Sequence, residues 1–236
     1  MTQKELFNYK KTISFLLGSL FVLALPPYYI FIASFISISG LLLLLNQSNS
    51  KKHAFALGYW FGFGFFAFGF SWVGNALLID ALTFGWLYPL VLIGSGAFFG
   101  LFFAIPAWLV SYFNGITAKA LAFASFYTLS EWLRSFILTG FPWNQLGSML
   151  AFDTHALQLA SVLGAFGLTF LILTLTGCPA IFYQTKNKRA IVLALAIVAI
   201  IWGFGYYRVH ALPNYEKSNT IIRIVQPSIP QTMKWD

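Results

Sequence analysis

The residues most able to take part in chemistry are two oppositely charged side chains, Glu131 and Arg134, inside an otherwise apolar stretch of the chain. Charged side chains are rare and costly within a membrane span, which makes them the first candidates for a functional role. Their spacing places both on one face of a helix, where they can pair. The pair either neutralises itself and fixes helix packing, or it forms a polar anchor near one membrane surface.

A loop of aromatic and helix-breaking residues follows this pair. Gly140 and Pro142 are expected to end the helix, and Phe141 and Trp143 are residue types that sit at a membrane interface. The loop is either a plain turn that carries interfacial aromatic residues or the floor of a lipid-facing site. Composition leaves both interpretations open.

Other catalytic signatures are absent from the sequence. It contains no G-x-S-x-G elbow, no H-E-x-x-H pair and no phosphate-binding loop. His53, His155 and His210 stand singly, so each is expected to be a loop or interface residue and not a metal ligand. Cys178 has no neighbouring base in the sequence, and a buried thiol stays protonated, so we interpret it as a small core residue. No catalytic residue, metal or cofactor is predicted from these patterns.

Composition determines the class of protein. Hydrophobic residues make up 59% of the chain and charged residues only 8%, against roughly 25% charged in ordinary soluble domains. The formal charge of +8 raises the question of a nucleic-acid partner. Its basic residues lie in small groups between apolar runs, without a patch of interleaved aromatic residues, which argues against nucleic acid. The composition predicts an integral membrane protein that crosses the bilayer several times.

Seven apolar stretches are candidates for membrane-spanning helices, so we predict an all-α membrane fold. The first could be a cleaved signal peptide, but Leu25-Pro-Pro-Tyr28 is a poor cleavage site and a second apolar run follows at once. The stretches run over about Thr12–Leu25, Tyr28–Leu45, Ala54–Ile79, Trp86–Phe113, Lys119–Leu138, Ala156–Tyr183 and Ala190–Tyr207.

The orientation follows from the basic residues, which mark the cytoplasmic side of a membrane protein. Lys and Arg occupy the N-terminus and every second connection, whereas the connections around residues 26–27, 80–85 and 140–153 contain none. We therefore expect a cytoplasmic N-terminus and, after seven crossings, an external segment from Arg208 onward. Pairs of glycines four residues apart, at Gly58 and Gly62 and at Gly96 and Gly100, predict close helix packing.

Several short strings lie along the chain in a definite order and spacing. They are 25–27, the aromatic run 58–73, E-W-L-R at 131–134, T-G-F-P-W at 139–143, Q-L-G at 145–147, 159–168 and 225–236. The most specific are T-G-F-P-W and the final Q-x-x-I-P-Q-x-x-K-W-D. Together these strings closely resemble bacterial apolipoprotein N-acyltransferase, and the resemblance spans the whole chain.

The resemblance implies an enzyme of the bacterial inner membrane with two substrates, a phospholipid acyl donor and a diacylated apolipoprotein acceptor. The family works through an enzyme thioester, with Glu, Lys and Cys in a nitrilase-like α/β domain that faces the periplasm. These three groups are expected beyond Asp236, so we expect the chain alone to be inactive. Residues 1–211 would then be the transmembrane bundle, and residues 212–236, with a strand-like run at 220–226, would be a truncated start of the periplasmic domain.

The resemblance also assigns candidate site residues. Trp235 matches a tryptophan that the family requires for activity, although an interfacial anchor is an alternative interpretation. The lipid-site candidates Glu131, Arg134, Phe141, Pro142 and Trp143 would shape or line a site near the outer leaflet. Two other functions are alternatives: a membrane scaffold that acts with a separately encoded nitrilase-like chain, and a transporter, for which the sequence shows no inverted repeat.

Overall fold

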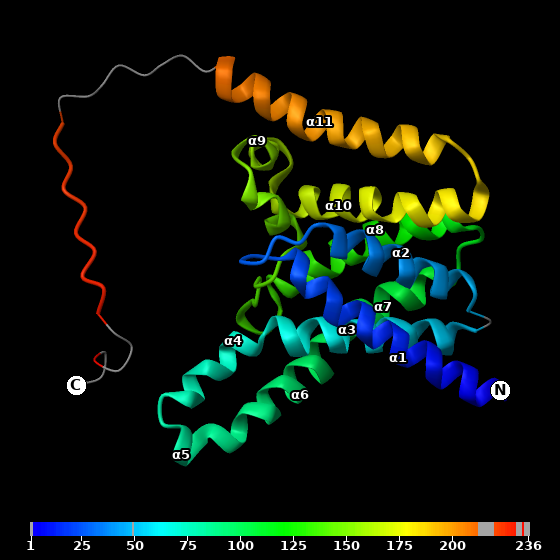
Figure 1. Ribbon diagram of the computed structural model, residues 1–236, viewed down its shortest axis with the longest axis horizontal. Coiled ribbons are helices and arrows are strands. Elements are labelled where there is room, and N and C mark those ends of the chain that lie inside the picture. Colours follow the sequence, from blue (N-terminus) through cyan, green and yellow to red (C-terminus); the bar gives the residue numbers. More distant parts are fainter. Residues whose placement is uncertain (1, 49, 212–219, 230–232, 234–236) are drawn as a thin grey trace.

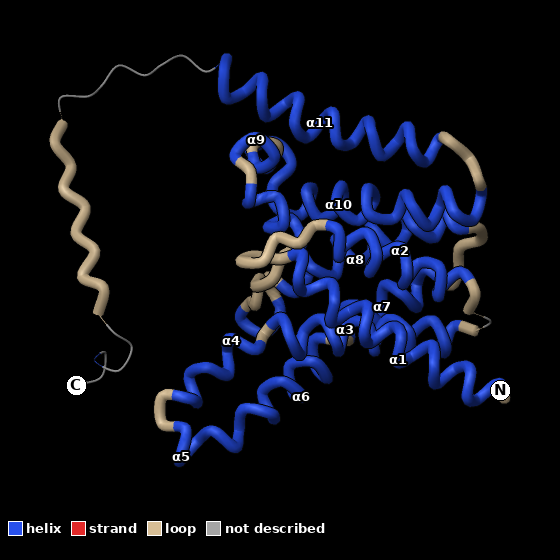
Figure 2. The backbone as a smooth tube through the Cα atoms, in the orientation of Figure 1, coloured by secondary structure: helices blue, strands red, loops and turns tan. Residues whose placement is uncertain are grey.

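The computed structural model describes residues 2–48, 50–211, 220–229 and 233, and within these residues every regular element is a helix (Figure 2). The elements are α1 (Gln3–Phe21), η1 (Val22–Ala24), α2 (Ile32–Asn46), α3 (Lys51–Gly69), α4 (Ser71–Gly74), η2 (Asn75–Leu78), α5 (Ala81–Phe84), η3 (Gly85–Leu87), α6 (Tyr88–Phe99), α7 (Leu101–Val110), α8 (Ile116–Arg134), η4 (Ile137–Thr139), η5 (Leu146–Phe152), α9 (Thr154–Leu157), α10 (Ala160–Thr185) and α11 (Arg189–Ala211).

Helix α1 begins well before the apolar stretch predicted from Thr12. Thr2 and Glu5 form a capping box, in which Thr2 Oγ1 accepts from the Glu5 N–H at 3.2 Å and Glu5 Oε2 accepts from the Thr2 N–H at 2.7 Å. This reciprocal capping satisfies two backbone donors that a helix start leaves unpaired. The polar first turns of α1 therefore extend the helix beyond its apolar part.

The predicted close approach of the glycine pairs is confirmed. Helix α3 packs against α6 and α7, and side chains at the glycine positions would collide with the partner's backbone. A Cβ at Gly62 would lie 2.7 Å from the carbonyl oxygen of Gly100, and one at Gly96 would lie 2.9 Å from that of Phe63. Small residues thus bring these helix backbones together, as they do in lipid.

Buried serines also link the helices. Ser14 on α1 donates to the carbonyl oxygen of Leu57 on α3 at 2.6 Å, and Ser39 on α2 donates to that of Thr176 on α10 at 2.8 Å. Such hydrogen bonds between helices stabilise bundles whose surroundings offer no water.

The all-α membrane class is confirmed. Among the described residues, Ala81–Val110, Ala160–Thr185 and Arg189–Ala211 are long and apolar enough to cross a bilayer. A fourth crossing is present if α3 and its continuation through Leu78, which are bent by 44°, count as one broken span. In Figure 1 the hairpin of α4, α5 and α6 projects away from the other helices, and α11 lies beside α10. Seven spans and their orientation stay predictions.

The described part of α11 ends at Ala211, and residues 212–219 lie outside the described residues, so the boundary predicted between residues 211 and 212 stays a prediction. Residues 220–229 adopt neither helix nor strand within the described part of the chain, although a strand-like run is expected at 220–226, and their side chains are exposed. Trp235 lies outside the described residues, so its predicted role stays a prediction.

Candidate functional site

The two charges predicted inside the membrane lie in the last two turns of α8. Glu131 and Arg134 are each only 1% exposed. The predicted pairing is present, with Arg134 Nη2 at 3.9 Å from Glu131 Oε1. This distance is longer than a hydrogen bond. Each side chain has closer partners elsewhere, and those partners define the site.

Glu131 binds the start of the 3₁₀ helix η5. Its Oε1 accepts from the backbone N–H of Leu146 at 2.9 Å, and its Oε2 accepts from the hydroxyl of Thr169 at 2.6 Å. The Thr169 hydroxyl in turn accepts from the N–H of Gly147 at 3.0 Å. The first two N–H groups of η5 are thereby satisfied by side chains of α8 and α10, and the carboxylate charge lies at the positive end of that helix.

Arg134 holds the loop that precedes η5. Its Nη1 donates to the carbonyl oxygens of Phe141 and Trp143, at 2.6 and 2.7 Å. The N–H of Phe141 donates back to the carbonyl oxygen of Arg134 at 3.0 Å. The guanidinium also lies 5.3 Å from the centre of the Phe66 ring, within the range of a cation–π contact. Arg134 therefore fixes the backbone of Phe141 and Trp143, the residues on either side of Pro142, independent of their side chains.

The loop needs unusual backbone angles to reach these donors. Thr139, Gly140 and Asn144 all have positive φ, and glycine and asparagine adopt this region most readily. A Cβ at Gly140 would also press against the carbonyl oxygen of Ser135. The Asn144 side chain adds a further tie by donating to the carbonyl oxygen of Gly69 at 2.8 Å, which joins the loop to the end of α3.

The aromatic residues of the loop divide between core and surface. Phe141 is half-buried, and its ring centre lies 5.1 Å from that of Phe70 and 5.2 Å from that of Phe99. Its predicted place at the membrane interface stays a prediction. Trp143 is 55% exposed and meets Trp72 edge to face at 5.4 Å. Pro142 is exposed beside it. Among the described residues of the predicted set, Pro142 and Trp143 are therefore the exposed ones, able to contact a ligand or lipid.

A hollow of about 460 Å³ lies beside the loop, with Asn144 and Trp72 in its wall. Its lining is mostly apolar, with polar groups from two serines, the Asn144 amide, the Tyr28 hydroxyl and the Trp72 indole, a composition suited to part of a lipid molecule. The remaining lining residues are Ser19, Val22, Leu23, Leu25, Pro26, Pro27, Tyr28, Phe68, Gly69 and Ser71.

The buried pair is built to hold structure and not to transfer protons. Both oxygens of Glu131 already accept hydrogen bonds, and the carboxylate is shielded from solvent. Cys178 is buried in α10 with its Sγ at 3.3 Å from the carbonyl oxygen of Thr174, which agrees with a core residue. Within the described residues, no three His, Cys, Asp or Glu side chains come together as metal ligands.

The three histidines stand singly in the sequence, but two of them come together in the structure. The rings of His155 and His210 stack with centres 6.0 Å apart, and Tyr206 lies 4.1 Å from His210. Asp153 Oδ2 is 3.8 Å from His155 Nδ1. All three histidines lie on helices and not in loops, with His53 in the first turn of α3. His155 and His210 are far apart in the sequence, so the sequence gives no sign that the contact between α9 and α11 brings them together.

Sequence reasoning missed two polar contributors to the site, Thr169 and Asn144. Thr169 lies within a long apolar run and carries no local signal of its role. Asn144 follows Trp143 in a turn, a position where asparagine tolerates positive φ, so turn chemistry could have identified it.

Comparisons with known proteins place these residues in context. A family model described as "Apolipoprotein N-acyltransferase N-terminal domain" matches residues 17–178. A protein of Brucella melitensis named apolipoprotein N-acyltransferase is 39% identical over 94% of this chain and 44% of its own length. Relatives of the same name from Rhizobium etli and Caulobacter vibrioides are each 36% identical, over 93% and 91% of this chain. The chain thus spans less than half the length of these relatives.

Proposed function

The chain belongs to the apolipoprotein N-acyltransferase family, and on this premise we propose that it forms the membrane part of a lipoprotein acyltransferase. The reaction would move an acyl chain from a phospholipid to the α-amino group of a diacylglyceryl-cysteine. The carrying observation is the similarity to a protein of that name over nearly the whole chain. Neither a transporter nor an independent scaffold is favoured by relatives with this name.

The proposed location is the bacterial inner membrane, with seven spans and a cytoplasmic N-terminus. The alternation of basic and non-basic connections supports this topology. In it, the loop at 140–147 lies at the outer leaflet, and residues 212–236 lie in the periplasm as the start of a nitrilase-like domain. Both lipid substrates would reach the enzyme from that leaflet.

The proposed role of the loop is to form the floor of the lipid site. Three features support it: Pro142 and Trp143 are exposed, a partly polar hollow adjoins Asn144, and buried charges fix the loop backbone. Lipid substrates gain reactivity only when they are held in position, and a rigid surface supplies that positioning. Glu131 and Arg134 would then be positioning residues that act through the loop.

The proposed chemistry uses groups other than those at this site. A cysteine thiolate would attack the phospholipid ester, release a lysophospholipid and form a thioester, which the lipoprotein amine would then cleave. Burial and the lack of a nearby base among the described residues argue against Cys178 in this role. The family's Glu, Lys and Cys would belong to the part of the relatives that this chain does not match, and Trp235 would lie close to that part.

A chimera tests the proposal. The chain would be continued with the C-terminal part of the Brucella melitensis relative, and acyl transfer from phospholipid to a diacylated lipopeptide would be followed by the mass of the peptide. We expect transfer by the chimera and by its Cys178→Ala variant alike. An inactive, folded chimera beside an active full-length relative would contradict the proposal, as would turnover by this chain alone that requires Cys178.

A further inference from the structure

A second pocket lies at the other end of the bundle, away from the Glu131 loop. It holds about 160 Å³ between the start of α1, the end of α2 and the start of α3. The lining residues are Gln3, Leu6, Phe7, Lys10, Gln47, Ser48, His53 and Leu57. This volume accommodates a group the size of several water molecules, each of which occupies about 30 Å³ in the liquid.

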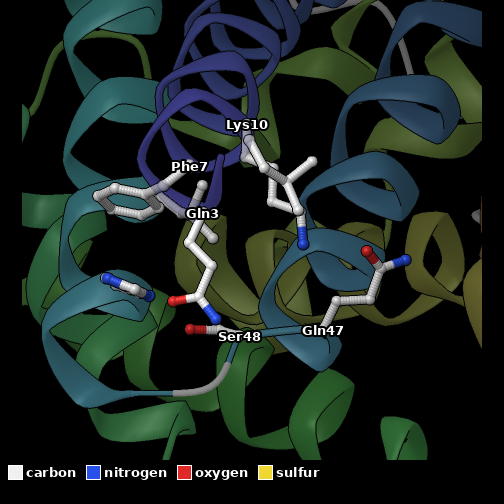
Figure 3. A pocket seen from close by; sticks show the side chains of 8 residues that line it. Gln3, Phe7, Lys10, Gln47 and Ser48 are labelled. Carbon is white, nitrogen blue, oxygen red and sulfur yellow. The ribbon is translucent and has the colours of Figure 1, made fainter. Parts of the chain in front are cut away.

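Polar side chains converge on this pocket from different helices. Figure 3 shows the amide of Gln3 and the ammonium of Lys10 reaching from α1 toward Gln47 and Ser48. Among the described residues, the side chains of Gln3, Lys10 and Gln47 have no hydrogen-bond or ion-pair partner. Lys10 is half-buried at this pocket. Such an arrangement offers several donors to one anion.

The aromatic wall of the pocket is held rigid by stacking. The ring of Phe7 lies 3.9 Å from that of His53 at an angle of 25° between their planes. Lys11 Nζ lies 4.4 Å from the centre of the same Phe7 ring, a cation–π distance. Helix α1 and the start of α3 are therefore fixed relative to each other at the pocket.

The surrounding charge favours an anion. Lys11 lies next to Lys10 on α1, and Lys51 lies in the first turn of α3. Lys51 is turned outward, with its Nζ 3.7 Å from the centre of the Tyr112 ring. The one acid on α1, Glu5, already accepts from the N–H of Thr2 in the capping box. Its carboxylate is thus engaged in the capping box, and among the described residues that line the pocket none is an acid that would compete for Lys10.

We propose that this pocket binds a phosphate group, with Lys10 as the charged contact and the amides of Gln3 and Gln47 as further donors. Lysine binds phosphate as a point charge, and amides complete the hydrogen bonding of the oxygen atoms. A phospholipid headgroup and free inorganic phosphate both carry this chemistry. The site is separate from the proposed acyl-transfer surface and does not depend on that function.

Binding to the purified, detergent-solubilised chain tests the proposal. The probes are dioleoylphosphatidylglycerol, inorganic phosphate and dioleoylglycerol, which lacks the phosphate, and the readouts are adducts in native mass spectrometry and the thermal midpoint. The variants are Lys10→Gln and, as a matched loss of charge at an exposed lysine outside the pocket, Lys52→Gln. Gln47→Leu, at an exposed position, gives a second test if Lys10→Gln does not fold.

We expect Lys10→Gln to weaken binding about tenfold, the loss of one hydrogen bond from a charged group, and Lys52→Gln to weaken it by less than about twofold, as for an exposed charge. Binding of the phospholipid alone identifies the headgroup as the source, and binding of inorganic phosphate alone identifies the free anion. Either result supports the pocket. Equal loss in both lysine variants, or equal binding of dioleoylglycerol, overturns it.

Discussion

Glu131 Oε1 accepts a hydrogen bond at 2.9 Å from the backbone N–H of Leu146, so a charge at the end of α8 caps the helix η5 that begins after the loop. The Thr169 hydroxyl completes this arrangement from α10. Three elements therefore meet at one buried carboxylate. The loop between α8 and η5 is fixed at its far end by Glu131 and along its length by Arg134.

Removing the charge of Glu131 should lower the free energy of unfolding far more than removing the charge of an exposed acid. Glu131→Gln leaves Arg134 buried beside a neutral amide, and unpairing a buried charge costs about 3–5 kcal/mol. Glu5→Gln, at the exposed capping box of α1, should cost about 1 kcal/mol or less. Thermal unfolding in detergent, followed by tryptophan fluorescence, compares the two. Similar thermal midpoints for both variants would show that the charge of Glu131 does not contribute the stabilisation assigned to it.

Thr169 should contribute to stability because its hydroxyl both donates one hydrogen bond and accepts another. Thr169→Val leaves both Glu131 Oε2 and the N–H of Gly147 without a partner, at a cost of about 1–3 kcal/mol for a buried group left unsatisfied. Thr176→Val is the control, since the buried Thr176 hydroxyl bonds only to the carbonyl oxygens of its own helix. The free energy of unfolding should fall in the first variant and change little in the second.

Gly147 should not tolerate a methyl group. A Cβ there would press on the carbonyl oxygen of Ala165 and lie 3.2 Å from the Cβ of Leu168, and such overpacking costs about 1–3 kcal/mol. Gly203→Ala in α11 meets nothing within 4 Å and should gain up to about 1 kcal/mol from helix propensity. We expect Gly147→Ala to lower the thermal midpoint and Gly203→Ala to raise it. A destabilised Gly203→Ala beside an unaffected Gly147→Ala would contradict the packing described here.

The seven-span topology predicts opposite sides for two exposed positions. In a Cys178→Ala background, we expect Leu82→Cys, at the 99% exposed tip of the α4–α6 hairpin, to react with an impermeant maleimide in spheroplasts. Asn187→Cys, between α10 and α11, should react only in inside-out vesicles. Labelling of both positions from one side would exclude the predicted topology.

Local spacing and composition predicted the helical membrane class, the pairing of Glu131 with Arg134 and the glycine contacts between α3 and α6. They could not predict that Glu131 has closer partners than Arg134, because Thr169 and Leu146 come near only through the packing of α8 against α10 and η5. Residue type likewise gives no sign that the ring of Phe141 packs against Phe99 of α6 and against Phe70, which follows α3.

Arg134 is proposed to hold the loop on which acyl transfer depends, and the transfer rate of the chimera that carries Arg134→Lys tests this role most directly. Lysine keeps the charge but not the planar guanidinium, and we expect a loss of about ten- to hundredfold from a displaced loop. Arg189→Lys, an exposed arginine at the start of α11, should retain the full rate. Equal rates for both variants, with Arg134→Lys folded, would contradict the account.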